Sequence, residues 1–395
     1  MRAAAISVAA AFAFLVVLQV SLAGVLQYVL PFKTLAWAPN NAIAQATMAA
    51  RLQAAGRLPE ARTMAIAALQ RDSTTVAALR TLALTAEAEG DQAQALRLID
   101  LAHDLSRRDL PTQLWLISHS IRAGDLEAAV HHFDLAMRTS TQGSDQLIPL
   151  LVAATGDERL LPPLSRLLAR NPSWKLTFLS QLGALGPRPD HNVWLTRGRL
   201  DPALPEEREA IRSLISRLAG AGRFDLAWQL YHDVSPGVDA ASLRSGNFEG
   251  SEGYPPFDWS FADDPDLSAL RISRPDGAPG YALSLLAQNS RTGDVARQVI
   301  RLAPGAYRLE YDAGAVPAST SERPVVSLTC PDRSEPILAL RPDTAREAPQ
   351  RVGGMFSVPT GCTWQSLSIS ISGSGSGSDA TVSPWIDNIA IRRAG

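Results

Sequence analysis

The spacing of hydrophobic and polar positions changes twice along the chain. Residues 3–26 are almost wholly apolar, whereas the following stretch has apolar positions at the three- and four-residue spacing of amphipathic helices. After about Pro236 the spacing becomes two, as from Tyr307 to Asp312, which is typical of half-buried strands. We therefore predict a multidomain protein with, in order, a transmembrane signal anchor over 1–32, an all-α solenoid over 38–235 and an all-β sandwich over 240–395.

The N-terminal apolar segment has the length of a membrane-spanning helix. No charged residue lies between Arg2 and Lys33, and a bilayer core requires about 20 apolar residues of a helix. Because Arg2 and the terminal amine precede the segment, the positive-inside rule predicts a cytoplasmic N-terminus. We expect a single-pass inner-membrane protein with the bulk of the chain in the periplasm. The alternative is a secretory signal cleaved at Ser21-Leu22-Ala23, which would also export the rest of the chain.

The helical stretch contains a repeat with a period of 34 residues. Three registers share this period, namely the glycines Gly56, Gly90 and Gly124, the alanines five residues on (Ala61, Ala95 and Ala129) and the alanines twelve residues on (Ala68, Ala102 and Ala136). A glycine ends a helix where a left-handed backbone is required, and small alanines let the next helix pack closely. The pattern predicts stacked helix pairs that bury one another's apolar faces.

This repeat resembles the tetratricopeptide repeat. The match is specific in its first three units and blurs afterwards, where Pro162 and Pro163 enter a second helix and further prolines predict a loop-rich insertion over 186–205. Gly222 opens a last recognisable unit, so we expect five or six helix pairs. The resemblance implies a scaffold that binds a protein partner. The alternative is a spacer that only separates the sandwich from the membrane.

The C-terminal third carries strand-like segments with turn residues between them. The turn Ala303-Pro304-Gly305 predicts a hairpin in which residues 299–302 fold back onto 307–311. Several segments resemble the jelly rolls of carbohydrate-binding modules, a galactose-binding-like superfamily; they are Ser-Gly-Asn-Phe-Glu (245–249), Pro-Pro-Phe-Asp-Trp (255–259) and Trp-Ile-Asp-Asn-Ile-Ala-Ile (385–391). The resemblance implies an antiparallel jelly-roll sandwich, but the superfamily also includes members that bind nothing known.

The resemblance also implies two sites. In such modules an acidic residue of the first strand and one of the last often share a structural calcium ion, and the matching positions are Glu249 and Asp387. The alternative is that Glu249 caps a turn and Asp387 pairs locally. The second site is a platform for a polysaccharide, because a sugar ring stacks on an exposed aromatic face. The candidate platform residues, any of which can instead belong to the core, are Tyr254, Trp259, Tyr281, Trp364 and Trp385.

The only two cysteines, Cys330 and Cys362, both lie near predicted strand edges. Export to an oxidising compartment would favour a structural disulfide between them. The bond would close a loop of about 33 residues and would stabilise the fold by roughly 3 to 4 kcal/mol through the lost chain entropy. Two unpaired cysteines within strands are the alternative.

Charge and motifs exclude several functional classes. Lys and Arg total 37 against 39 for Asp and Glu, and no basic stripe points to a nucleic-acid partner. The sequence has no Gly-x-Ser-x-Gly elbow, phosphate-binding Gly-Lys loop, His-Glu-x-x-His or Cys-x-x-Cys pair, so we predict no catalytic residue. His131 and His132 would point about 100° apart on a helix, which favours packing or solvation over a shared metal ion.

We predict a non-enzymatic scaffold, and its resemblance to exported tetratricopeptide arrays joined to sugar-binding-like sandwiches implies that it is accessory to exopolysaccharide or cell-surface polysaccharide assembly. The helical repeats would bind a protein partner, and the sandwich would contact a glycan. One alternative is a glycan-processing enzyme in which the sandwich is a targeting module and catalytic acids line the repeats. The other is a purely structural protein–protein scaffold that binds no glycan.

Overall fold

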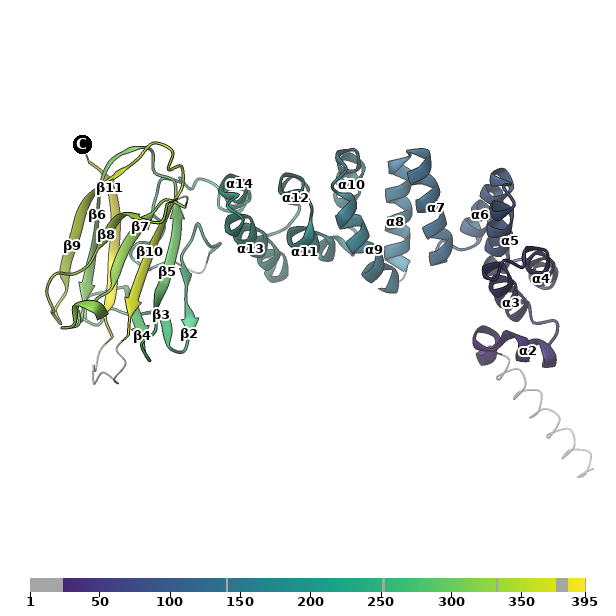
Figure 1. Ribbon diagram of the computed structural model, residues 1–395, viewed down its shortest axis with the longest axis horizontal. Coiled ribbons are helices and arrows are strands. Elements are labelled where there is room, and N and C mark those ends of the chain that lie inside the picture. The colour runs from purple at the N-terminus through teal and green to yellow at the C-terminus, as the bar shows by residue number, and fades with distance from the viewer. Residues whose placement is uncertain (1–23, 140, 251–252, 332, 374–382, 395) are drawn as a thin grey trace, which may run out of the picture. The chain divides into compact units, whose positions relative to one another are not determined.

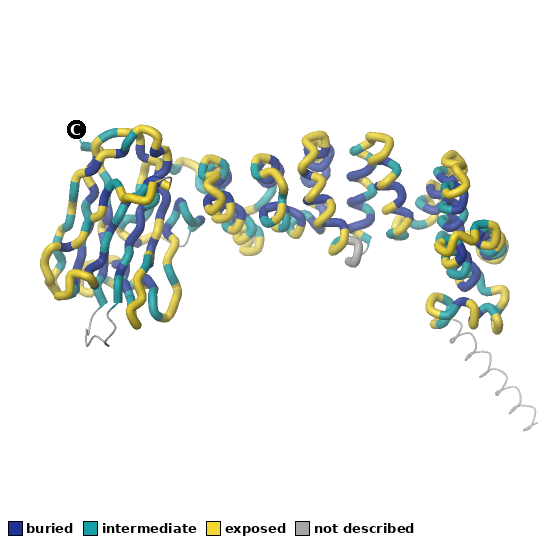
Figure 2. The backbone as a smooth tube through the Cα atoms, viewed as in Figure 1, coloured by how far each residue is buried: buried dark blue, intermediate teal, exposed yellow. Residues whose placement is uncertain are grey.

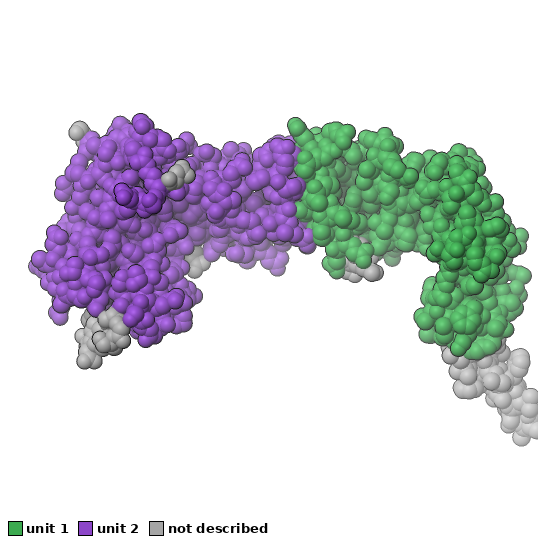
Figure 3. Space-filling model, viewed as in Figure 1, with its two compact units in different colours: residues 1–175 green, residues 176–395 purple. Residues whose placement is uncertain are grey.

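The computed structural model describes residues 24–139, 141–250, 253–331, 333–373 and 383–394 (Figure 1). It divides into two compact units, residues 1–175 and residues 176–395 (Figure 3). The described part of the first unit is helical throughout, and the second unit joins four helices to a β-sandwich. The predicted order of an all-α part followed by a β-sandwich is therefore confirmed.

The first unit is a series of helices joined by short turns. Its helices are α2 (Pro31–Trp37), α3 (Ala42–Ala54), α4 (Leu58–Arg71), α5 (Val76–Ala88), α6 (Gln92–Leu105), α7 (Leu110–Ala123), α8 (Leu126–Thr139), α9 (Thr141–Ala154), the 3₁₀ turn η1 (Glu158–Leu160) and α10 (Leu161–Leu168). Helices α3 to α8 pair successively as three hairpins. Each hairpin corresponds to one period of the sequence repeat.

The repeat residues act as their types predict. Gly56, Gly90 and Gly124 have φ values of 75°, 89° and 76°, a left-handed conformation that favours glycine. Gly124 caps α7, and its N–H donates to the carbonyls of Ser120 and Ile121. The alanines of the repeat are all buried at the contacts between helices, namely Ala61, Ala68, Ala95, Ala102, Ala129 and Ala136. Figure 2 shows buried positions, in dark blue, recurring along the helices of this unit.

The predicted membrane location requires correction. Among the described residues, no helix is long and apolar enough to cross a membrane. The longest helix with both ends among the described residues, α13, has 16 residues, and at about 1.5 Å per residue it is shorter than the roughly 30 Å of a hydrocarbon core. A single-pass inner-membrane protein is therefore not supported. Most of the apolar segment on which that prediction was based, residues 3–23, lies outside the described residues.

A buried glutamine links two histidines in the core of the first unit. The Gln113 Nε2 donates to the Arg107 carbonyl at 3.2 Å and lies 3.0 Å from His103 Nδ1, while Gln113 Oε1 lies 3.0 Å from His132 Nδ1. Because the Arg107 carbonyl requires the amide nitrogen on its side, His103 Nδ1 must accept and His132 Nδ1 must donate. Burial, followed by the charges of His103 and His131, lowers the pKa of His132 to about 4.

We expect this network to make the first unit acid-sensitive. The pKa of His132 is lower in the folded chain than its ordinary value. Between about pH 6.5 and pH 4 the unfolded chain therefore binds a proton at this residue that the folded chain does not. The free energy of unfolding should decrease as the pH falls through that range. After discounting for the partial exposure of the ring, we expect a loss of about 2 kcal/mol. His132→Asn keeps a donor toward Gln113 and cannot titrate. Urea unfolding of both full chains should therefore show a smaller loss for the variant; an identical loss would contradict the assignment.

The second unit contains helices α11 (Lys175–Leu185), α12 (Pro189–Thr196), α13 (Pro205–Gly220) and α14 (Phe224–Val234). The expected loop-rich insertion over 186–205 is only partly a loop, because α12 occupies its centre. Pro189 begins α12, and a proline is tolerated in the first turn of a helix, where its missing N–H would have no partner. The prolines therefore mark helix starts rather than a break in helical structure.

The sandwich consists of two antiparallel sheets. The five-stranded sheet has the order β1-β5-β10-β7-β8 and the six-stranded sheet has the order β2-β3-β4-β11-β6-β9. The strands are β1 (Ser260–Phe261), β2 (Asp263–Asp264), β3 (Leu267–Ser273), β4 (Tyr281–Ala287), β5 (Thr292–Ile300), β6 (Gly305–Gly314), β7 (Val325–Thr329), β8 (Pro336–Leu340), β9 (Gln350–Val358), β10 (Gln365–Ser372) and β11 (Trp385–Arg393), with the 3₁₀ turn η2 (Thr320–Glu322) between β6 and β7. Alternate residues of both sheets, among them Leu309 and Ile369, fill the core between them.

The predicted hairpin around Pro304 is wrong. Strand β5 pairs with β1 and β10, whereas β6 pairs with β9 and β11, so the chain crosses from one sheet to the other at this turn. The buried side chain of Gln365 accepts from the Leu302 N–H at 2.7 Å and donates to the Leu302 carbonyl at 3.4 Å. These bonds replace the strand pairing that a hairpin would have given Leu302.

The predicted disulfide is confirmed. Cys330 follows β7 and Cys362 precedes β10, its neighbour in the five-stranded sheet, and the two residues are bonded with a Cα–Cα distance of 5.6 Å. The pairing of β7 with β10 brings the two cysteines together.

Helices α13 and α14 pack on the sandwich through an aromatic cluster. The Trp228 ring of α14 lies 5.1 Å from that of Phe257 and 5.9 Å from that of Trp364 between ring centroids, and the Trp364 indole N–H donates to Asp225 at 3.1 Å. Helices α13 and α14 and the sandwich belong to the same compact unit, which begins after Lys175.

Candidate functional site

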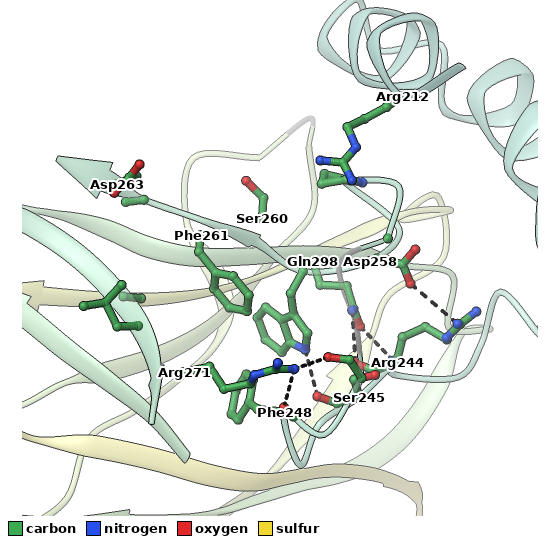
Figure 4. Close-up of a pocket in the computed structure, with 17 residues that line it drawn as sticks. Arg212, Arg244, Ser245, Phe248, Asp258, Ser260, Phe261, Asp263, Arg271 and Gln298 are labelled. Carbon is green, nitrogen blue, oxygen red and sulfur yellow. Dashed lines mark hydrogen bonds and ion pairs between the residues drawn. The ribbon is translucent and has the colours of Figure 1, made fainter. Parts of the chain in front are cut away.

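The sandwich carries a cleft of about 530 Å³ at the start of its first strands (Figure 4). The segment that precedes β1, strands β1 and β3, and single residues of β2, β5 and α13 contribute to its walls. Its lining includes polar and charged side chains, namely Arg212, Arg244, Ser245, Asp258, Ser260, Asp263, Arg271 and Gln298, and the three aromatic rings of Phe248, Trp259 and Phe261. The cleft thus combines exposed ring surface with hydrogen-bonding groups.

Two parallel rings lie beside one another in the cleft. Trp259 and Phe261 are two residues apart in an extended segment, which places both side chains on one side of the backbone. Their planes differ by 10° and their centroids are 6.3 Å apart. Trp259 is held by its indole N–H, which donates to the Ser245 carbonyl at 3.1 Å, and only 8% of its surface is exposed. Phe261 is 41% exposed and presents an open ring.

Asp258 organises the cleft wall next to helix α14. Its carboxylate accepts from the Tyr231 hydroxyl at 3.1 Å and from the Tyr254 backbone N–H at 2.8 Å, and it lies 3.7 Å from the Arg244 guanidinium. Arg244 also donates to the Tyr231 hydroxyl oxygen at 2.7 Å. A side chain at Gly253 would collide with this carboxylate, since a Cβ there would lie 2.1 Å from Asp258 Oδ2. Burial raises the pKa of Tyr231, so its hydroxyl stays protonated and donates.

Arg271 is held in place by backbone carbonyls. Its guanidinium donates to the carbonyls of Gly250 and, at 3.5 Å, Phe248, and it lies 4.9 Å from the centroid of the Tyr281 ring. Tyr281 is 40% exposed. Backbone carbonyls orient a guanidinium without neutralising its charge.

The predicted platform residues fall into two groups. Tyr281 is exposed and lies against Arg271, as described above. The other four are buried, and a buried ring face cannot stack on a sugar. Trp259 packs against Phe261, and Tyr254 and Trp364 pack in the cluster with helices α13 and α14. Trp385 lies between Arg274 and Gly314. The sequence interpretation missed Phe261, Arg271 and Asp258. The spacing of Trp259 and Phe261 was the available signal for the first of these.

The two predicted calcium ligands are engaged by protein groups. Glu249 accepts from the Tyr281 backbone N–H at 2.7 Å, and Asp387 forms an ion pair with Arg274, which also pairs with Asp276 at 2.7 Å. Hydrogen bonds to Asp276 and the charge of Asp387 raise the pKa of Arg274. Since the guanidinium already lies against the Asp387 carboxylate, these residues do not fit a calcium ion. The described residues also contain no cluster of three or more His, Cys, Asp or Glu side chains that could hold a metal.

We expect the stability of the sandwich near Asp387 to depend on the positive charge of Arg274 and not on a metal ion. Adding a chelator to the full chain should leave the unfolding temperature unchanged. Arg274→Gln should destabilise the chain by about 3 to 5 kcal/mol in chemical denaturation, because it removes the ion-pair partner of the buried Asp387 carboxylate. The matched control is Arg297→Gln, which breaks an exposed pair with Asp294 and should cost at most about 1 kcal/mol. A drop in unfolding temperature with chelator, restored by calcium, would overturn this assignment.

Comparison with known proteins identifies no family. No family model and no curated protein matches the sequence. Among solved structures, the CBM4 module is 16% identical and covers 39% of this chain and all of its own, with a TM-score of 0.29. TmCBM61 in complex with β-1,4-galactotriose is 14% identical over 38% of this chain and 97% of its own, and the family 22 module of Clostridium thermocellum Xyn10B is 16% identical over 38% and 92%, both with TM-scores of 0.27. Matches with such low sequence identities and TM-scores do not indicate the activity or the ligand of this chain.

Proposed function

We propose that the protein is a non-enzymatic glycan-binding scaffold whose sandwich binds a carbohydrate chain in the cleft of Phe261. The single observation that carries the proposal is the exposed Phe261 ring, which lies parallel to Trp259 in a cleft with polar walls. Sugar rings have one apolar face and a rim of hydroxyl groups. A fixed aromatic face with hydrogen-bonding groups around it suits both.

Phe261 suits a sugar platform because neighbouring rings hold its side chain in place. A freely rotating exposed phenylalanine would lose side-chain entropy on binding, whereas the Phe261 ring already packs on Trp259 and near Phe248, with centroids 6.4 Å apart. Ser245 and Ser260 provide donors and acceptors around the rings. The ring also favours a glycan ligand over the purely structural scaffold, because 41% of Phe261 stays exposed within the cleft.

The carboxylates of the cleft favour binding over glycoside hydrolysis. A glycosidase needs two carboxyl groups that face the scissile bond. Of the two carboxylates among the described lining residues, Asp258 already accepts two hydrogen bonds and faces Arg244. This arrangement leaves Asp258 a structural group, and the alternative of a glycan-processing enzyme has less support.

The test is binding of the full chain to a panel of exopolysaccharides and cell-surface polysaccharides by affinity electrophoresis and calorimetry. Phe261→Ala should weaken binding about tenfold, because it removes the stacking face and leaves the core intact. The matched control is Met355→Ala on β9, which is likewise exposed but does not line the cleft. Equal affinities for wild type and Phe261→Ala would contradict the placement of the site, and the absence of any binding would contradict the function.

We also propose that the helical repeats bind a protein partner, so that the chain is accessory to polysaccharide assembly. Exposed apolar side chains on described helices of the first unit support this role; they are Ile66, Leu101, Leu105, Leu114, Ile121 and Leu150. Cross-linking of the full chain in cells should recover a protein that a chain with Leu101→Ser and Ile121→Ser does not. Recovery of the same proteins with both chains would contradict the proposal and favour a simple spacer.

A further inference from the structure

Resting on the proposed function, we propose that the cleft prefers acidic glycans and that Arg271 binds their carboxylate. The preference follows from how the charges around the cleft are held. Three guanidinium groups and two carboxylates are among its described lining residues (Figure 4). One carboxylate, that of Asp258, already lies against Arg244 and takes part in the contacts with Tyr231 and Tyr254. Asp258 and Arg244 therefore largely cancel one another.

Arg271 differs from Arg244 in its partners. Among the described residues, no carboxylate lies within ion-pair distance of Arg271. Its guanidinium contacts the carbonyls of Phe248 and Gly250 and the face of the Tyr281 ring. Carbonyls and an aromatic face fix the direction of the guanidinium, and no described carboxylate compensates its positive charge. Both of these hydrogen bonds use Nη1. A guanidinium has five N–H donors, so others remain for a planar carboxylate.

The position of Arg271 relative to the rings suits a uronic acid. Arg271 and Phe261 both line the same cleft, on β3 and β1 respectively, and Figure 4 shows both side chains beside it. A uronic acid carries its carboxylate at the edge of the sugar ring. Stacking of that ring on Phe261 would direct an edge group toward the cleft walls, where an arginine gives a charge-assisted hydrogen bond that a neutral hydroxymethyl group cannot match.

The experiment uses the full chain and a panel of soluble polyuronates, each paired with its carboxyl-reduced derivative, in calcium-free buffer. Reduction converts the carboxylate to a hydroxymethyl group and leaves the rest of the polymer unchanged. We expect the acidic member of at least one pair to bind about tenfold more tightly or better, and the affinity to fall as salt is added. Arg271→Gln should remove the difference between the two members, while Arg271→Lys should retain part of it.

Arg308→Gln is the matched control, because Arg308 is exposed on β6, pairs with Glu310 and does not line the cleft. It should leave both affinities unchanged. Equal or tighter binding of the carboxyl-reduced polymers to wild type would overturn the acid preference and leave the proposed glycan binding intact. No binding of any member, acidic or neutral, would overturn both. A preference that survives in Arg271→Gln, in a chain with unchanged unfolding temperature, would overturn the role of Arg271.

Discussion

The contact of Asp258 with helix α14 is the constraint on which the candidate site depends. Asp258 receives hydrogen bonds from the Tyr231 hydroxyl and the Tyr254 backbone, and Tyr231 is fully buried in α14. Beside this polar contact, the aromatic cluster of Trp228, Phe257 and Trp364 excludes water from the contact between α14 and the sandwich. A hydrogen-bonded carboxylate in such a place is costly to leave unpaired, so the segment before β1 has few other conformations open to it.

Because of these contacts, helices α13 and α14 pack on the sandwich as one unit with it and do not serve only as a linker. Residues 205–234 cover aromatic side chains of the sandwich that would otherwise face water, and Arg212 of α13 lines the cleft itself. Whatever the cleft binds therefore touches a wall supported by helices. The ring pair of Trp259 and Phe261 follows directly from the segment that Asp258 holds, so the platform is built on a braced backbone rather than on a free loop.

Arginine side chains perform three different tasks in the sandwich, and their partners distinguish them. Arg274 lies between two aspartates and over the Trp385 ring, where it serves as an internal cation. Arg323 is buried and donates to four backbone carbonyls, which ties two loops together. Arg271 is also held by carbonyls but borders the open cleft. The same residue type is structural in the first two positions and is available to a ligand in the third.

Local rules within the sequence determined the elements of this protein, whereas long-range packing decided the site. The sequence predicted the 34-residue repeat, the glycines that end its helices (Gly56, Gly90 and Gly124) and the alternation of β6 and β10. Each of these features depends on residues that are near one another in the chain, within one helix pair or one strand. The partner of a strand, the side of the sheet that helices cover and the counter-ion of a carboxylate depend on residues far away in the chain. For this reason the sequence did not reveal that β5 and β6 lie in different sheets or that Trp364 and Trp385 are buried. It also did not reveal that Asp387 pairs with Arg274, 113 residues away in the chain.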